Sequence, residues 1–222
     1  MLLKRSREKE LMDNFGIEDE RIDLALKEIA KVNKLLGGIS VSRSALKILL
    51  KNHKKEVNLL DVGAGGCDIF LNGHYSTHIK LTTVDANLRS CRYLLSKTKS
   101  ISIVCGDAKA LPFKKKSFDV IHASLFLHHF ADEEIIMLLK SFLELAKLGV
   151  IINDLHRSIF AYWGIKIISF LFSKSELFKN DAPLSVKRGF TKNELKTILN
   201  KIGKKYIINW RWAFRWRVVV EV

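Results

Sequence analysis

Apolar and polar positions alternate along the middle of the chain in blocks typical of strands and helices. Short apolar runs rich in β-branched residues predict strands, and apolar positions three or four apart predict the helices between them. Because strands alternate with helices, we expect βαβ units in a mostly parallel sheet. The strands are predicted over residues 57–62, 80–85, 101–105, 120–123 and 150–153, and the helices between them over 88–97 and 132–147.

Two helices are predicted before the first strand, behind a polar, basic leader over residues 1–16. The first helix ends at Gly37, since glycine is common just past the end of a helix. The second is expected over about 43–52, with Ser42 as its N-terminal cap. These elements form a predicted N-terminal helical cap over residues 1–56.

The C-terminal part departs from the alternation. Thr191 and Glu194 have the spacing of a capping box, which predicts another helix. The β-rich segments 206–210 and 214–222 lie too close in sequence for a crossover helix, so they must pair antiparallel at one edge. We therefore predict a doubly wound, Rossmann-like α/β fold over 57–222, with seven strands that are parallel except for this pair.

Composition places the chain among ordered globular proteins, with 48% hydrophobic and 27% charged residues and only two prolines. The net charge of +15 favours an anionic partner such as nucleic acid or a membrane surface, or else a solvated lysine-rich face. The three cysteines form no CxxC pair, and no signal segment opens the chain, so we expect a reducing cytoplasm.

The stretch NLLDVGAGGCD, over 58–68, runs an apolar strand into a glycine-rich loop that can approach a nucleotide-like cofactor closely. Gly63 and Gly65 fit the first two positions of the dinucleotide fingerprint, but Asp68 occupies the third. A carboxylate there would repel a pyrophosphate. A cationic cofactor without phosphate fits better, because Asp61 stands two residues before the first glycine.

At this point the chain resembles the class I S-adenosylmethionine (SAM) dependent methyltransferases. Their first motif is acid-x-G-x-G-x-G, which reads here as Asp61, Gly63, Gly65 and Cys67. SAM carries an ammonium and a sulfonium, which nearby acids attract. Cys67 departs from the third glycine of the motif, and since it is small we expect only a mild loss of affinity.

Further markers follow in the family's order. Asp85 ends the second predicted strand, where it would accept both ribose hydroxyls, and Asp107 resembles the acid that faces the adenine amine. Residues 111–130 resemble the fourth-strand block of small-molecule methyltransferases of the quinone-biosynthesis type. The same acids could instead serve as turn residues, and Asp61 could simply fix the loop. The resemblance implies cofactor contacts from Asp61, Gly63, Ala64, Gly65, Asp85, Ala86, Asp107, Ala108 and Ser124.

Candidate catalytic residues follow strands four and five. His128 is the first choice and His156 the second, because histidine titrates near neutrality and suits a phenol or carboxyl acceptor. Arg157 could hold an acceptor carboxylate or phenolate, or could pair with Asp181 as a brace. The histidines and cysteines show no metal-ligand spacing, so no metal is expected.

The apolar segment 159–172 is too short to span a bilayer. Three interpretations stay open: a lid over the acceptor, a peripheral membrane contact, or a packed core helix. As part of a lid-like insertion at about 155–190, it would line the pocket with aromatic side chains and favour aromatic or lipid-like acceptors. These side chains are Phe160, Tyr162, Trp163 and Phe170.

The predicted function is methyl transfer from SAM to a small, aromatic or lipophilic acceptor of the phenol, quinone or polyketide type. One alternative is an RNA-directed methyltransferase, suggested by the charge. Against base methylation, the chain reads HASL at the fourth strand, where enzymes acting on exocyclic amines resemble one another in an (N/D/S)-P-P-(Y/F) block. The second alternative is a non-catalytic partner protein with the same fold. Oligomeric state is left open.

Overall fold

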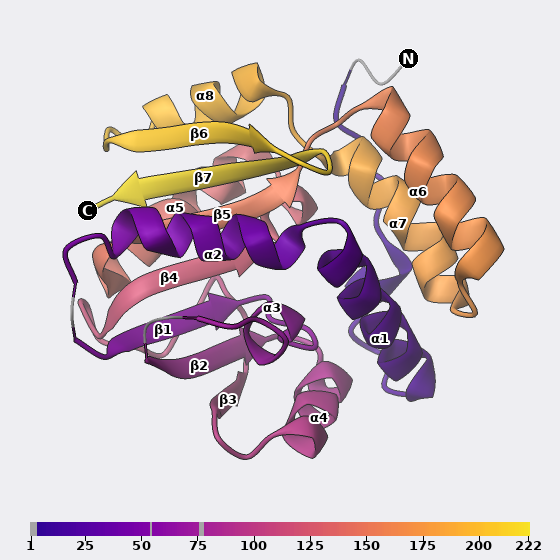
Figure 1. The fold of residues 1–222 in the computed structure, drawn as a ribbon, viewed down its shortest axis with the longest axis horizontal. Helices are drawn as coiled ribbons and strands as arrows, with labels where there is room; N and C mark the ends of the chain where they lie inside the picture. The colour runs from indigo at the N-terminus through magenta and orange to yellow at the C-terminus, as the bar shows by residue number, and fades with distance from the viewer. Residues whose placement is uncertain (1–3, 54, 76–77) are drawn as a thin grey trace.

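The computed structural model describes residues 4–53, 55–75 and 78–222, so the first three residues of the leader lie outside it. A seven-stranded sheet with helices on both faces forms its centre (Figure 1). The strands are β1 Val57–Val62, β2 Ile79–Asp85, β3 Ser102–Cys105, β4 Phe118–Ser124, β5 Ala146–Leu155, β6 Tyr206–Arg211 and β7 Arg215–Glu221. The helices are η1 Leu11–Asp13, α1 Glu20–Leu35, α2 Gly38–Leu49, α3 Asp68–Leu71, α4 Leu88–Lys97, η2 Leu127–His129, α5 Asp132–Leu145, α6 Ile159–Phe172, α7 Glu176–Arg188 and α8 Lys192–Asn200.

The strand order is β3-β2-β1-β4-β5-β7-β6, with β1 to β5 parallel. Strand β7 lies antiparallel between β5 and β6. The predicted fold class, including the antiparallel C-terminal pair, is confirmed. The order reverses direction between β1 and β4, and ligands of open α/β sheets bind at the carboxyl ends of the strands at such a point.

The central strands are buried on both faces. Leu59 and Ile151 pack into a core shared with α2 and α4, whereas Leu60 and Ile152 pack into a second core with α5 and α8. Because neighbouring residues of a strand point to opposite faces, both sets must be apolar. This explains why the strands read as continuous apolar runs.

Several boundaries differ from the prediction. Strand β4 begins at Phe118 instead of residue 120, and β5 spans Ala146–Leu155 instead of 150–153. Helix α2 begins at Gly38, directly after Gly37 takes a left-handed conformation (φ +78°), and not at about residue 43. Ser42 is therefore buried inside α2 instead of capping it. Helix α5 ends at Leu145 because Ala146 is already extended and opens β5.

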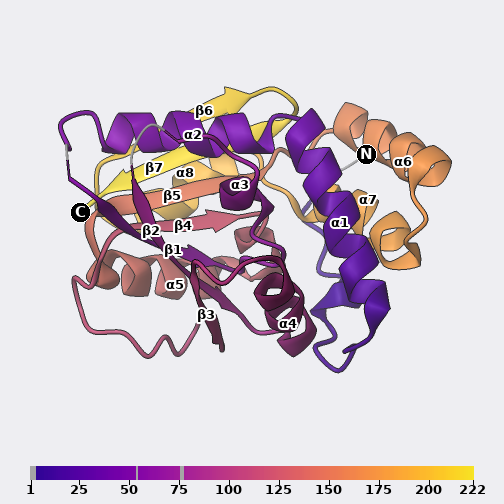
Figure 2. The ribbon, with the colours of Figure 1, turned by 60° about the horizontal axis from the view of Figure 1, so that its bottom comes forward.

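Helices α1, α6 and α7 gather beyond the carboxyl ends of β4 and β5 (Figure 2). The N-terminal segment joins them, since Ser6 N–H donates to the carbonyl of Lys187 and the Asp181 carboxylate accepts from the Leu11 and Met12 amides. The segment that precedes α1, residues 5–15, thus lies across the end of the sheet, and we call it the strap. Within the described residues, no helix is both long and apolar enough to cross a membrane.

Candidate active site

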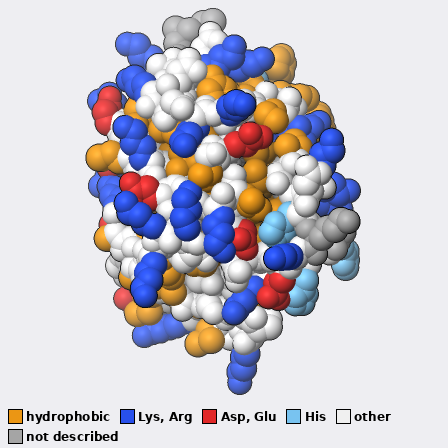
Figure 3. Space-filling view, turned by 90° about the vertical axis from the view of Figure 1, so that its left-hand side faces the viewer, with side chains coloured by type: hydrophobic (Ala, Val, Ile, Leu, Met, Phe, Trp, Pro, Cys, Tyr) orange, Lys and Arg blue, Asp and Glu red, His pale blue; other side chains and the backbone are white. Residues whose placement is uncertain are grey.

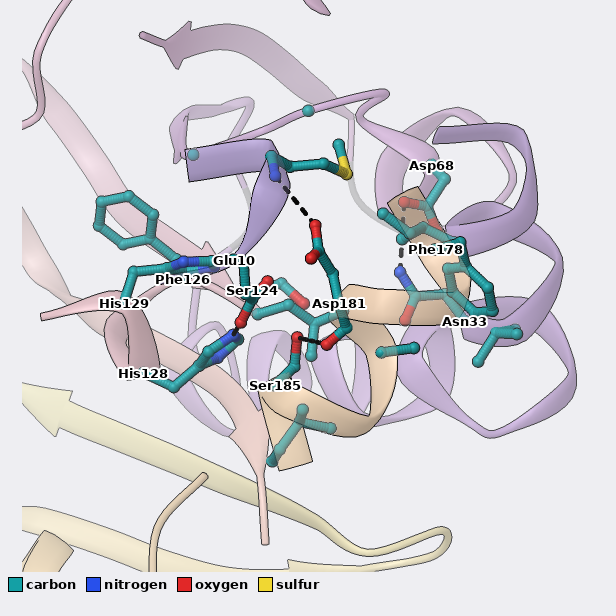
Figure 4. Close-up of a pocket in the computed structure, with 18 of the residues that line it drawn as sticks. Glu10, Asn33, Asp68, Ser124, Phe126, His128, His129, Phe178, Asp181 and Ser185 are labelled. Carbon is teal, nitrogen blue, oxygen red and sulfur yellow. Dashed lines mark hydrogen bonds and ion pairs between the residues drawn. The ribbon is translucent and has the colours of Figure 1, made fainter. Parts of the chain in front are cut away.

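A cavity of about 500 Å³ lies between the strand ends and the helices beyond them. Small-ligand pockets commonly measure about 300–1,000 Å³. Its strand-end half is formed by the loops after β1, β2 and β4, and its helical half by the N-terminal segment, α1, α6 and α7 (Figure 4). The predicted contacts that line the strand-end half are Asp61, Gly63, Ala64, Gly65, Asp85, Ala86 and Ser124.

The glycine loop needs left-handed backbone at several positions. Gly63 has φ +66°, and a Cβ there would lie 2.1 Å from the Phe126 ring, so only glycine fits. Cys67 adopts φ +50° although it carries a side chain. Its thiol is buried and lies 3.6 Å from a carboxylate oxygen of Asp61. Burial raises the pKa of the Cys67 thiol well above its usual range. Cys67 is not among the described residues that line the cavity, so it fills space behind the loop.

Asp85 ends β2 and is held by two backbone donors. One carboxylate oxygen accepts from the Gly65 amide at 2.7 Å and the other from the Asn87 amide at 2.9 Å. Burial raises the pKa of the Asp85 carboxyl. The contact with Gly65 ties the end of β2 to the glycine loop, so the carboxylate keeps one position at the cavity wall.

Asp61 points into the protein as well as toward the cavity. Its Oδ1 lies 2.7 Å from His122 Nδ1, and His122 Nε2 lies 2.8 Å from Ser42 Oγ. The Asn153 amide donates to the same Ser42 hydroxyl at 2.9 Å. This buried chain links β1, β4, β5 and α2, which supports the interpretation that Asp61 fixes the loop.

The same network of buried hydrogen bonds extends to a second acid, Asp68. Arg215 donates to Asn153 Oδ1 at 3.2 Å and to Asn33 Oδ1 at 2.5 Å, and the Asn33 amide donates to Asp68 Oδ1 at 3.3 Å. Among the described residues, Asp68 Oδ2 has no hydrogen-bond partner although it is buried. Burial raises the pKa of Asp68. Asp68 therefore presents an unsatisfied carboxylate oxygen at the cavity wall.

Two predicted cofactor contacts lie elsewhere. Asp107 is exposed, accepts from the Lys109 amide at 2.9 Å and is absent from the described cavity lining. Ala108 is buried in the core beneath it. Ser124 does line the cavity, and its hydroxyl is buried with no partner among the described residues.

His128 lines the cavity near the junction of its halves. Its Nδ1 lies 2.7 Å from Asp154 Oδ1 at the end of β5, and its Nε2 lies 3.4 Å from Glu10 Oε1 on the N-terminal segment. Burial lowers the pKa of His128, but the Asp154 and Glu10 carboxylates outweigh it and raise this pKa to about 9.

The other two predicted catalytic residues do not line the cavity within the described residues. His156 accepts from Trp210 Nε1 at 3.2 Å and packs against Trp216. Arg157 forms an ion pair with Glu194 at 2.7 Å and donates to the Gly189 carbonyl. These contacts correct the expectation that His156 and Arg157 face the acceptor, and they replace the alternative pairing of Arg157 with Asp181.

The insertion forms the wall of the helical half, but mostly through other side chains than expected. Of the four predicted aromatic residues, only Phe160 lines the cavity. Phe170 is 78% exposed and Trp163 51% exposed on the opposite side of α6. The sequence pattern missed the inner face of α6, which consists of Ala161, Gly164, Ile165 and Ile168, and the strap residues Glu10, Met12, Asp13 and Phe15.

Comparison with known proteins bears on this site. Residues 60–148, from β1 to β5, match a family model described as a methyltransferase domain. The chain carries a methyltransferase domain. The loops that form the strand-end half of the cavity lie within this matched region. S-adenosylmethionine is the cofactor of the enzyme. No curated protein matches the chain in sequence.

Solved structures share the fold of this methyltransferase. A SAM-dependent methyltransferase from Aquifex aeolicus aligns with a TM-score of 0.62 and 15% identity over 89% of this chain and 96% of its own. The plantazolicin methyltransferase BamL, in complex with a triazolic desmethylPZN analog and SAH, gives 0.66 and 14% over 96% and 99%. Magnesium protoporphyrin IX methyltransferase from Synechocystis with bound SAM gives 0.52 and 12% over 82% and 77%.

The residues of the strand-end half fit SAM. A loop without side chains at Gly63 and Gly65 admits a ligand closely, and the carboxylates of Asp85 and Asp68 suit a cofactor that carries positive charge. The unpaired oxygen of Asp68 and the unpaired hydroxyl of Ser124 are buried polar atoms that a ligand would satisfy.

Proposed function

We propose that the enzyme transfers the methyl group of SAM to a small lipophilic acceptor with an aromatic or lipid-like body, such as a phenol, quinone or polyketide-like molecule. The lining of the helical half is the observation that carries this proposal, because an apolar wall rewards burial of an apolar ligand. Its apolar members come from three helices: Leu26, Ile29 and Val32 of α1, Phe160, Ile165 and Ile168 of α6, and Phe178 and Val186 of α7.

Each end of the cavity has a distinct role in this proposal. SAM supplies an electrophilic methyl group on its sulfonium. Asp85 would hold the ribose hydroxyls and Asp68 the ammonium of the methionine part, while His128 at the cavity wall would face the acceptor. The chain thereby positions donor and acceptor, and positioning alone can remove about 7–11 kcal/mol from a bimolecular barrier.

The cavity is less suited to nucleic acid, which binds mainly through its phosphates. Among the described lining residues, Arg215 is the one Lys or Arg, and its guanidinium is buried and engaged with Asn153 and Asn33. Figure 3 shows the end of the molecule away from α6 and α7, where Lys and Arg side chains are scattered between acidic and apolar ones. Such a spread suits a solvated face.

A transfer assay tests the proposal. The purified enzyme is incubated with methyl-labelled SAM and, in turn, with 1-naphthol, a long-chain quinol and a mixed-sequence RNA. We expect label in the organic extracts of the small acceptors and none above background in the RNA. Label in RNA alone would contradict the proposal and favour the RNA-directed alternative.

The outer face of α6 suggests how a lipophilic acceptor arrives. It exposes Ile167, Phe170, Leu171 and Phe172 by 55–78%. Basic side chains border it, since Lys166 lies 5.0 Å from the Trp163 ring and Lys187 lies 5.3 Å from the Tyr162 ring. We propose that α6 lies on an anionic lipid surface, because apolar burial and attraction to acidic headgroups act together on such a helix.

Vesicle sedimentation tests this contact. We expect the protein to pellet with phosphatidylglycerol vesicles and to stay in solution with purely zwitterionic ones. Phe170→Ser with Phe172→Ser should abolish pelleting, whereas Met137→Ser, a matched loss of an exposed side chain on α5, should not. Equal pelleting by both variants would exclude α6 as the contact.

A further inference from the structure

Three potential metal ligands meet where the strap crosses the cavity. They are Glu10 on the strap and the neighbouring His128 and His129 in η2, and one ligand atom from each lies within 4.8 Å of the others. Glu10 and His128 are buried, and His129 is half-buried. The gap of more than a hundred residues between Glu10 and the histidines explains why spacing along the sequence gave no sign of a site.

Both imidazoles are oriented by carboxylates. His128 Nδ1 lies 2.7 Å from Asp154 Oδ1, and His129 Nδ1 lies 2.7 Å from Asp13 Oδ1. An imidazole that donates its Nδ1 proton to a carboxylate keeps the lone pair on Nε2, which is the arrangement typical of metal-binding histidines. The rings lie nearly side by side, with centroids 4.2 Å apart.

Two buried atoms of the cluster face each other at the range of a long ion pair. Glu10 Oε1 and His128 Nε2 are both buried, and neither has a hydrogen-bond partner among the described residues. They lie 3.4 Å apart. That is the edge of a tetrahedron whose ligands sit at the distances of zinc–nitrogen and zinc–oxygen bonds, about 2.0–2.2 Å. Figure 4 shows the Glu10 carboxylate above the His128 ring.

The charge around the cluster also matches a cation. Three carboxylates, those of Glu10, Asp13 and Asp154, lie around the cluster. The Arg188 guanidinium lies 2.7 Å from Asp13 and 3.8 Å from Glu10, and Arg5 donates to the His128 carbonyl at 3.3 Å. Buried charges persist when they are paired or coordinate a metal.

We propose that Glu10, His128 and His129 bind one first-row divalent cation, Zn²⁺ by preference. Two imidazoles and one carboxylate form a donor set known from catalytic zinc sites, in which a fourth position stays open. The three residues line the cavity, so an acceptor oxygen could take that position. This last role rests on the proposed function, whereas the ion site does not.

Metal titration tests the site without acceptor or SAM. Protein dialysed against a chelator is titrated with Co²⁺ and followed by visible absorption, and Zn²⁺ is then added in competition. We expect one Co²⁺ per chain, with the strong absorption of a tetrahedral site, and its displacement by Zn²⁺. Absence of both signals in the folded protein would overturn the proposal.

Variants locate the ion. Glu10→Gln should weaken Co²⁺ binding by at least ~100-fold, and Asp13→Asn, which removes the carboxylate that orients His129, by about 10–100-fold. Glu8→Gln, an exposed acid on the same strap, is the matched control and should leave the titration unchanged. Equal effects of Glu10→Gln and Glu8→Gln would refute the assignment.

X-ray absorption of the Zn²⁺-loaded wild-type protein keeps the proposal falsifiable if a variant fails to fold. We expect two imidazole ligands and one carboxylate. A spectrum without imidazole would contradict the site. If the ion binds but neither 1-naphthol nor the quinol is methylated, the site stands and the proposed function fails. Methylation by metal-free protein would refute only the ion's role with the acceptor.

Discussion

The strand-end half and the helical half of the cavity differ in the side chains that form their walls. In the strand-end half, hydrogen bonds join groups on neighbouring strands, as in the contacts of Asp85 with Gly65 and of Asp61 with His122. In the helical half, apolar side chains of α1, α6 and α7 form the wall, and α6 leaves its other face exposed. The comparison indicates that the strand-end half, which we propose for the cofactor, is fixed by hydrogen bonds across the sheet. The helical half, which we propose for the acceptor, is built by helices beyond the sheet.

The largest effect should come from breaking the network under the strand-end half. His122→Leu leaves the Asp61 carboxylate buried without its imidazole partner, which should lower the free energy of unfolding by about 3–5 kcal/mol. Urea denaturation at constant m-value measures this. His78→Leu, a change at an exposed histidine, should cost little. A similar small loss in both variants would mean that the network does not support this half.

Filling the helical half with a large side chain should reduce acceptor turnover without changing cofactor affinity. Gly164 faces the cavity, and a Cβ there meets no atom within 4 Å, so Gly164→Phe projects a ring into the acceptor space. We expect naphthol turnover to fall by ~100-fold, as for a misplaced acceptor, with SAH affinity unchanged. Gly164→Ala is the control with nearly normal turnover. Parallel loss of SAH affinity would show that the halves are one unit.

Removing the carboxylate at the end of β2 should weaken the cofactor alone. Asp85→Ala should reduce SAH affinity by about 1–3 kcal/mol, because ligand hydroxyls lose their acceptor. Calorimetry measures this change. Asp107→Ala is the informative comparison, since Asp107 is exposed outside the lining, and we expect a smaller loss. If Asp107→Ala reduces SAH affinity as much as Asp85→Ala does, the adenine binds at Asp107, as the family resemblance implies and the cavity lining does not.

Acid should weaken the cofactor site through the same residue. Burial raises the pKa of Asp85, so its carboxylate protonates at a higher pH than an ordinary aspartate. The ionised form accepts hydroxyl donors, and SAH binding should therefore fall as pH drops through this raised pKa. The free protein responds oppositely, losing the contribution of Asp85 to stability as pH rises from the unfolded toward the folded pKa. The SAH-induced shift in Tm, measured from pH 7 downward, checks the sign, and Asp85→Asn should flatten it.

The smallest effect is expected at the unusual third position of the loop. Cys67→Gly removes a buried thiol but relieves a left-handed backbone that glycine adopts freely. Because Cys67 does not line the cavity, SAH affinity should change by less than about 0.5 kcal/mol. Calorimetry on the two proteins decides. A large change would mean that the thiol shapes the cofactor site directly.

The contrast between the two halves of the cavity also explains which parts of the site could be predicted from the sequence. Strand β1 was predicted with its observed bounds, and Asp85 was predicted at the end of β2, because buried parallel strands carry continuous apolar runs and end at polar turns. A glycine loop is likewise a local signal. The strand-end half could therefore be predicted in outline, with Asp107 as the exception.

The helical half could not be predicted from the sequence, because its residues come from distant segments that meet only through tertiary packing. Nothing in the polar leader indicates that Glu10 reaches His128, and the aromatic residues of α6 are conspicuous in sequence although most of them face outward. Arg157 and His156 follow β5, yet contacts with Glu194 and Trp210 hold them away from the cavity. Side-chain direction after a strand depends on partners that are distant along the chain.

The central claim is that one cavity holds the methyl donor against the strand ends and the acceptor among the helices. A crystal structure with SAH tests it most directly. We predict the ribose hydroxyls within hydrogen-bond reach of Asp85 and the sulfur directed toward the space between His128 and α6. SAH bound away from Asp85, or with its sulfur turned away from the helical half, would contradict the account.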